Sequence, residues 1–187
     1  AEEGICGPQA MIEDGLFEKF PCDAVFGMHN RPGLPVGQFA VKAGAMMAGG
    51  AFFDIDITGK GAHGARPESG VDSVVVAAHI VTALQSIVSR NTRPLDTAVM
   101  SVTQIHSGDA YNVIPQTARL SGTVRTFSNE VMDLIEQRMT AISKGVAAGL
   151  GATAAVDFRT IFWPSVNDPQ EAEHAAEVRN TSVAAAT

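Results

Sequence analysis

The most regular pattern of apolar and polar residues lies between residues 51 and 162. Phe53, Ile55 and Ile57 alternate with polar neighbours, which is the period of a strand buried on one face. Residues 97–105, 117–127 and 152–160 are predicted as three further strands. In the last two strands, the residues expected to point inward are Ala118, Leu120, Val124, Ala154, Val156 and Phe158.

Two longer stretches repeat their apolar residues every three or four positions, the period of a helix with one buried face. The first covers residues 71–90, with a predicted inner face of Val74, Ala77, Ala78, Val81, Leu84 and Val88. The second runs from an N-cap at Ser128 to a stop at Gly149 or Gly151. Its predicted inner face consists of Val131, Leu134, Ile135, Met139, Ile142 and Val146.

The order strand, helix, strand, strand, helix, strand predicts an α+β, ferredoxin-like sandwich. Two helices are expected to cover one face of a four-stranded antiparallel sheet. Alternation in the third strand puts Arg119 and Arg125 on the other face. That polar face is left for solvent, a substrate or a partner.

The segment before the sandwich carries weaker patterns. Residues 11–20 are spaced as a short helix that Pro21 ends, and residues 23–29 form an apolar run that predicts a buried strand. Two prolines and two glycines make residues 31–37 a loop. Residues 38–46 are predicted as another strand.

After the sandwich, Trp163 and Pro164 break the pattern, and Asp168 with Pro169 opens a last helix. We expect this helix to belong with the first fifty residues, so that the sandwich is an insertion into another domain. The predicted boundaries give three segments, 1–48, 49–162 and 163–187. Neither end resembles a natural terminus, and we expect the chain to be a piece of a longer protein.

Composition narrows the class of protein. The chain has 187 residues, 45% of them hydrophobic, which is enough to build a core, and a formal net charge of -7. An acidic chain is unsuited to nucleic acid, whose phosphates attract a basic face. We find no run of about 18 apolar residues, and so expect no membrane span. Cys6 and Cys22 are predicted to be free thiols, which favours the cytoplasm.

Two histidines lie where a side chain could carry chemistry. His63 is flanked by Gly61 and Gly64, whose small size leaves an imidazole accessible to stabilise an oxyanion or accept a proton. An ordinary glycine-rich loop explains the same residues. His29 ends the predicted strand 23–29, a position typical of functional residues, although a hydrogen-bonded core histidine fits equally.

Other candidates have plainer explanations. The adjacent Glu2 and Glu3 are most simply a solvated pair. Asn112 lies between two strands and could donate to a carboxylate or oxyanion, but a plain connecting turn explains it nearly as well. His79 and His174 are interpreted as structural or solvated, and His106 as a loop residue.

Five stretches taken together resemble one family. They are Ala1-Glu2-Glu3-Gly4, Gly27-Met28-His29, Gly59 to Pro67, Asn112-Val113-Ile114-Pro115 and Gly122 to Thr126. In this order they resemble the aminoacylase/carboxypeptidase family of dinuclear metallohydrolases and amidohydrolases. The most similar branch hydrolyses N-acyl amino acids such as hippurate and indole-acetyl amino acids. The resemblance implies that the sandwich is a lid, inserted into an α/β catalytic domain that is only partly present.

The resemblance also implies roles for particular residues. Glu2 corresponds to the general base, and Glu3 and His29 to metal ligands. His63 corresponds to a lid histidine that reaches the partner subunit's site and stabilises the tetrahedral oxyanion. Asn112 and Arg125 correspond to residues that hold the substrate's carboxylate. Two divalent ions, of zinc, manganese or nickel, are expected in a complete site, where they would activate a water.

The sequence lacks several metal-ligand motifs of the family. The upstream metal ligands, an Asp motif and a Cys/His motif, and a late His are absent, and Cys6 stands where the family usually has glycine. We therefore expect this chain alone to bind metal weakly and to be catalytically silent. An alternative interpretation is a non-catalytic module that forms a homodimer through strand 97–105 and helix 71–90, since an apolar edge strand invites pairing.

Overall fold

The computed structural model describes residues 7–184, excluding the side chains of residues 179–184. The chain separates into two compact units. Residues 48–164 form one, called here the sandwich unit. The described residues on either side of it, up to Met47 and from Ser165, form the other, called the flanking unit.

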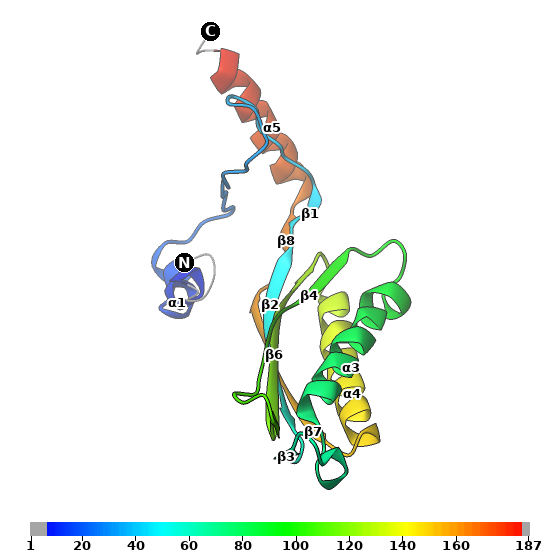
Figure 1. The fold of residues 1–187 in the computed structure, drawn as a ribbon. Coiled ribbons are helices and arrows are strands. Elements are labelled where there is room, and N and C mark those ends of the chain that lie inside the picture. The colour runs from blue at the N-terminus through cyan, green and yellow to red at the C-terminus, as the bar shows by residue number, and fades with distance from the viewer. Residues whose placement is uncertain (1–6, 185–187) are drawn as a thin grey trace. The chain divides into compact units, whose positions relative to one another are not determined.

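The sandwich unit is the ferredoxin-like fold that the sequence predicts. Its sheet has the strand order β4-β6-β2-β7, with every neighbouring pair antiparallel. Helices α3 and α4 cover one face of this sheet (Figure 1). The elements are β2 (Gly49–Thr58), α3 (Ser73–Ser86), β4 (Ala98–Ser107), β6 (Thr117–Thr126), α4 (Asn129–Gly149) and β7 (Thr153–Phe162).

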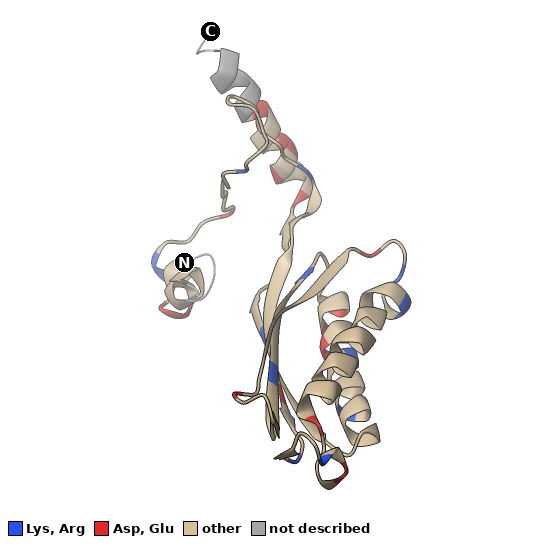
Figure 2. Cartoon of the chain, viewed as in Figure 1, with Lys and Arg blue, Asp and Glu red and all other residues tan. Residues whose placement is uncertain are grey.

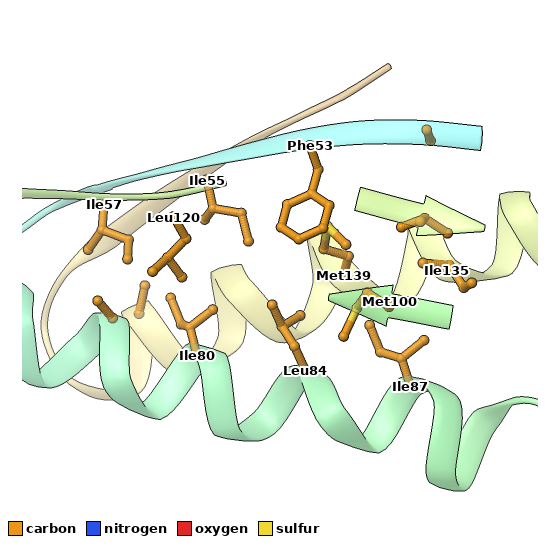
Figure 3. Close-up of a cluster of buried hydrophobic side chains, with 14 of the residues drawn as sticks. Phe53, Ile55, Ile57, Ile80, Leu84, Ile87, Met100, Leu120, Ile135 and Met139 are labelled. Atoms are coloured by element: carbon orange, nitrogen blue, oxygen red, sulfur yellow. The ribbon is translucent and has the colours of Figure 1, made fainter. Parts of the chain in front are cut away.

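Central strand β2 supplies the middle of the core. Phe53, Ile55 and Ile57 are buried, as their alternation predicts, and they point towards Ile80 and Leu84 of α3 (Figure 3). From the other strands and α4, the core adds Met100, Leu120, Val124, Ile135 and Met139. Each buried side chain of this size contributes on the order of 2 kcal/mol. The sheet–helix interface is therefore the main source of stability.

Both sandwich helices begin at a capped residue. The carboxylate of Asp72 accepts hydrogen bonds from the backbone of Val74 (2.9 Å) and Val75 (3.1 Å) and so starts α3. Ser128 Oγ accepts from the backbone of Val131 at 3.3 Å and starts α4, as predicted. Helix α3 continues into a π-helical turn, η2 (Ile87–Asn91).

The predicted inner face of α3 is partly wrong. Val74 and Ala78 are exposed, whereas Val76, Ile80 and Ile87 are buried together with the correctly predicted Ala77 and Leu84. Residues 74–76 are three valines in a row, so periodicity alone cannot select one face. The Asp72 cap and the packing on the sheet fix the rotation of the helix instead.

Helix α3 and the turn that follows it form the most apolar helical segment of the described residues. Residues 73–91 form 19 continuous helical residues with a hydropathy of 1.4, long and apolar enough to cross a membrane. The segment includes His79, Gln85 and Arg90, so it is not an unbroken run of apolar residues. In this fold the segment packs Val76, Ile80 and Leu84 on the sheet, which a core helix does equally well.

The flanking unit differs from its prediction in several places. The predicted helix 11–20 is interrupted at Gly15, whose φ of +83° ends the helical path. The predicted strand 23–29 is not a strand, and Met28 is 85% exposed. A strand needs partners for its backbone groups, and none of the described strands pairs with it. Helices α1 (Gly7–Glu13) and α2 (Leu16–Lys19) flank the break.

Of the predicted strand 38–46, only the end is extended. Strand β1 (Gly44–Met47) pairs with β8 (Ser165–Asn167), which the sequence did not predict. The last helix, α5 (Pro169–Ala184), starts where Asp168 accepts a hydrogen bond from the backbone of Gln170 at 2.8 Å. This start agrees with the prediction.

Candidate functional site

Two predicted site residues, His63 and Asn112, lie on two loops that pair with each other. The short strands β3 (Ala62–His63) and β5 (Val113–Ile114) pair antiparallel, with His63 opposite Val113. The backbone N–H of Gly64 donates to the carbonyl oxygen of Asn112 at 2.7 Å. Because β3 precedes α3 and β5 precedes β6, this pair joins two loops at one end of the sandwich (Figure 1).

The loop fixes which nitrogen of His63 can donate. The backbone N–H of Ala65 donates to His63 Nδ1 at 3.0 Å, so Nδ1 is an acceptor. A neutral imidazole with Nδ1 as acceptor carries its proton on Nε2. The ring is exposed and therefore presents an Nε2–H donor to solvent. A donor of this kind is what an oxyanion requires.

Glycines allow this loop to close. A Cβ on Gly59 would lie 2.3 Å from the carbonyl oxygen of Val71, and a Cβ on Gly70 would lie 2.7 Å from that of Lys60. Lys60 and Val71 form a bridge across the base of the loop, with both hydrogen bonds at 2.9 Å. The glycine-rich composition around His63 is thus a requirement of close backbone approach.

Arg125 lies at the other end of the same sheet. It is opposite Gly50 and Val99, near the end of β6, whereas Asn112 precedes the start of that strand. The eight residue steps from Thr117 to Arg125 span about 27 Å at the usual rise of an antiparallel strand. Arg125 and the His63–Asn112 pair of one chain therefore cannot hold the same small molecule.

The sheet face that carries Arg125 is rich in ion pairs. Arg119 holds Asp56 through two hydrogen bonds, of 2.6 and 2.7 Å. Arg159 donates to Asp54 at 2.6 Å and also pairs with Asp157. Along the ribbon of the sandwich, basic and acidic positions are interspersed (Figure 2).

These contacts shift the pKa values of the two central aspartates. A hydrogen bond from Ser121 Oγ (2.5 Å), followed by the one from Arg159, lowers the pKa of Asp54. The hydrogen bond from Arg119 lowers the pKa of Asp56. Both carboxylates stay ionised at neutral pH, so neither is suited to act as a general acid.

The predicted metal ligands do not form a site in the described part of the chain. Glu2 and Glu3 lie outside the described residues, so their predicted roles are not addressed by the structure. His29 lies in an exposed loop, with Nδ1 2.7 Å from the carbonyl oxygen of Asn30. Among residues 7–184, no group of three or more His, Cys, Asp or Glu side chains is placed to hold a metal.

His106 is not in the loop that the sequence predicts. It lies within β4, opposite Arg119, and lines an open hollow of about 940 Å³ together with Asp56 and Asp109. A β-bulge between Val102 and Gln104 shifts the register of β4. Beyond the bulge, apolar and polar residues no longer alternate in the phase of the first half of β4, so the pattern did not predict that the strand continues to His106.

The matched regions assign the sandwich to a family. The sequence profile of the peptidase dimerisation domain, from the M20 peptidases, matches residues 47–149. This match includes the His63 loop, Asn112 and Arg125, and it covers more than half of the chain. The chain belongs to the M20 peptidase dimerisation domain family.

Individual relatives agree with this family. A hippurate hydrolase of Campylobacter jejuni is 40% identical over 178 residues, covering 95% of this chain and 46% of the relative. An N-acetylcysteine deacetylase of Bacillus subtilis is 43% identical over 169 residues, covering 90% of this chain and 43% of the relative. The chain thus spans about half the length of the curated relatives that it matches.

Solved structures are similar to this chain in fold. A candidate aminohydrolase from methicillin-resistant Staphylococcus aureus is 30% identical, with a TM-score of 0.87 over 94% of this chain and 46% of that one. A Bacillus subtilis structure described as a dinuclear metal-binding peptidase of the M20 family is 33% identical, with a TM-score of 0.74. That match covers 94% of this chain and 43% of the other. Both support the lid interpretation of the fold.

Proposed function

We propose that the protein containing this chain is a metal-dependent amidohydrolase that cleaves the amide bond of small N-acyl amino acids. The observation that carries this proposal is the pairing of β3 with β5, which joins the loop of Asn112 to the loop of His63, whose Nε2–H donor is exposed. Relatives described as a hippurate hydrolase and as N-acetyl deacetylases support the substrate class. In each, the named substrate joins an acyl group to an amino acid.

We propose that a complete site uses both ends of the sheet, contributed by two subunits. His63 Nε2 would donate to the oxyanion that forms when hydroxide attacks the amide carbon. Arg125 would hold the substrate's carboxylate, a planar group that suits a guanidinium. Asn112 would add an amide donor beside His63. The distance of about 27 Å along β6 is the reason for dividing these roles between chains.

An antiparallel dimer would satisfy this geometry. Strand β4 is an edge of the sheet, with Val99 52% and Ile105 56% exposed. If two copies paired through β4, the His63 end of one copy would meet the Arg125 end of the other. Val74 and Val75 of α3, each 46% exposed, would extend the same apolar surface. We therefore propose a homodimer formed through β4 and α3.

The described residues do not themselves fit a metal site. We propose that Glu3 and His29 complete a site whose other ligands come from outside the described residues, and that Glu2 is its general base. The metals would be two ions of zinc, manganese or nickel. We propose that the chain alone is inactive, and that the protein is cytoplasmic, where the exposed thiol of Cys22 stays reduced.

The test is an amine-release assay with hippurate and N-acetyl amino acids, using the longest natural form of the protein that contains these residues. We expect hydrolysis that a chelator abolishes and that His63→Ala lowers by on the order of 100-fold or more, the usual cost of removing one oxyanion donor. His174→Ala, an exposed histidine on α5 and outside the proposed dimer surface, is the matched control and should keep full activity. Dimerisation without hydrolysis of any N-acyl amino acid would instead favour a non-catalytic dimerisation module.

A further inference from the structure

Arg125, Gly50 and Phe162 lie side by side on three neighbouring strands of the sheet. The central residue is a glycine and has no side chain. Gly50 of β2 pairs with Arg125 on one side and with Phe162 of β7 on the other. A Cβ at Gly50 would lie 2.7 Å from Phe162 Cζ and 3.1 Å from Arg125 Nη1. The missing side chain is therefore what allows the ring and the guanidinium to meet above the sheet.

A second ring contacts the guanidinium from the same strand as the glycine. The Cζ atom of Arg125 lies 6.0 Å from the centre of the Phe52 ring and 5.8 Å from that of Phe162. Both distances are within the range at which a cation interacts favourably with an aromatic ring. Both rings are half-buried, which strengthens such contacts by reducing competition from water.

Phe162 reaches this face because of a β-bulge. Phe158 packs on the core and Arg159 lies on the opposite face, so strict alternation would return residue 162 to the core. The pairing with β2 shifts between Gly50 and Ala51, where Phe162 and Thr160 are the partners. The extra residue, Ile161, turns Phe162 onto the face of Arg125, as bulges commonly re-aim side chains.

The hydrogen bonds of Arg125 leave one edge of its guanidinium available. Nη1 donates to Thr123 Oγ1 at 2.5 Å and to the carbonyl oxygen of Val124 at 2.9 Å. Within residues 7–184, its hydrogen bonds come from Nη1 alone, and it has no carboxylate partner. Arg119 and Arg159 on the same face are both paired with aspartates. The Nε and Nη2 edge can therefore receive an external planar anion.

We infer that Phe52 and Phe162 are positioning residues that hold the guanidinium of Arg125 over Gly50, with its Nε–Nη2 edge presented to a carboxylate. This inference rests on the proposed function for the identity of that carboxylate, the α-carboxylate of an N-acyl amino acid. The rings do not touch the reacting amide. They act on substrate binding by limiting the orientations of Arg125.

The first test is independent of enzyme activity. In the 187-residue chain, NMR of the Arg125 guanidinium measures rotation about its Nε–Cζ bond in wild type, Phe162→Leu and Phe162→Tyr. We expect faster rotation in Phe162→Leu and a wild-type rate in Phe162→Tyr, which keeps an aromatic ring. Equal rates in wild type and Phe162→Leu would overturn the inference.

The second test uses the longest natural form of the protein with an N-acyl amino acid. We expect Phe52→Leu and Phe162→Leu each to raise KM roughly two- to fivefold, with kcat unchanged. This rise corresponds to the loss of one cation–ring interaction at a partly exposed site. Phe162→Tyr should restore the wild-type KM. Phe158→Leu, the same change on the core side of β7, is the control and should leave KM unaltered.

The two tests separate the possible failures. An unchanged KM for both Leu variants in an active enzyme would overturn the positioning role. If wild-type protein hydrolyses no N-acyl amino acid, the proposed function fails, and the rotation rate of Arg125 still decides whether the rings hold it.

Discussion

Gly64 donates its backbone N–H to the carbonyl oxygen of Asn112 at 2.7 Å. This hydrogen bond lies beside the two-residue pairing of β3 with β5. The two residues are 48 positions apart in the chain, and they belong to the loops before α3 and before β6. This hydrogen bond joins the loop that carries His63 to the loop that carries Asn112. The placement of His63 therefore depends on how closely Gly64 and Asn112 can approach.

Gly64→Ala should disturb that surface without unfolding the protein. The added Cβ would lie 3.2 Å from the Asn112 carbonyl oxygen, so the β3–β5 pair must move apart by a few tenths of an ångström. We expect a loss of hydrolytic activity of about tenfold or more, because small displacements of a positioned donor are costly. Gly61→Ala is the control, since its Cβ would make ordinary contact at 3.4 Å. Equal activity in both variants would contradict the role given to the pair.

Gly122→Ala should destabilise the sandwich strongly. A Cβ at this position would lie 2.1 Å from the Ser101 carbonyl oxygen and 2.3 Å from Phe53 Cζ, inside the core. We expect the free energy of unfolding to fall by about 3 kcal/mol or more, measured by urea denaturation. Gly145→Ala, on the exposed side of α4 with nothing within 4 Å, should instead raise it by roughly 0.5–1 kcal/mol.

The ion pairs on the sheet should make stability depend on pH in acid. The pKa of Asp54 is lowered in the folded state, first by Ser121 and then by Arg159. Its contribution is fully present above the unfolded pKa of about 3.9 and is lost as the pH falls through the lower folded pKa. We expect Asp54→Asn to lose less free energy of unfolding than wild type between about pH 6 and pH 3.

Asp133→Asn, at an exposed position of α4, is the control for that pH titration. It should reproduce the wild-type pH dependence. If Asp54→Asn also reproduced it, the hydrogen bonds from Ser121 and Arg159 would not be contributing to stability.

Substitutions at the two edges of the sheet should differ in their effect on association. Ile105→Lys places a charge on the β4 edge, which we propose as the dimer interface, whereas Ala155→Lys changes the β7 edge. We expect light scattering at micromolar concentration to give a dimer for wild type and Ala155→Lys, and mostly monomer for Ile105→Lys. A monomeric wild type would contradict the proposed dimer.

The sandwich could be predicted from the sequence because its patterns are long. Ten-residue strands with residues such as Phe53 and Ile55, and a 21-residue helix capped by Ser128, repeat their signal many times. The inner face of α3 could not be predicted fully, because valines 74–76 fit more than one helical phase. The strand expected at residues 23–29 failed because pairing depends on neighbours that a local pattern does not reveal.

Candidate site residues could be named from the sequence, and their roles stay predictions, but their arrangement could not be predicted. The proximity of His63 to Asn112 depends on strands of two residues each, too short to give a pattern. The position of Phe162 beside Arg125 depends on a bulge, which alternation contradicts. Neither feature leaves a periodic signal. Glycines at positions 50 and 64 mark the two places where neighbouring segments of the backbone approach closely.

The claim that one active site draws on two subunits is central, and mixed dimers test it directly. His63→Ala and Arg125→Ala variants of the longest natural form, each inactive alone, would be unfolded and refolded together in equal amounts. If His63 serves the partner's site, half of the dimers are mixed and each has one intact site, so about 25% of wild-type activity should return. If His63 and Arg125 of one chain served the same site, no mixed dimer would hold an intact site. The activity would then remain that of the separate variants.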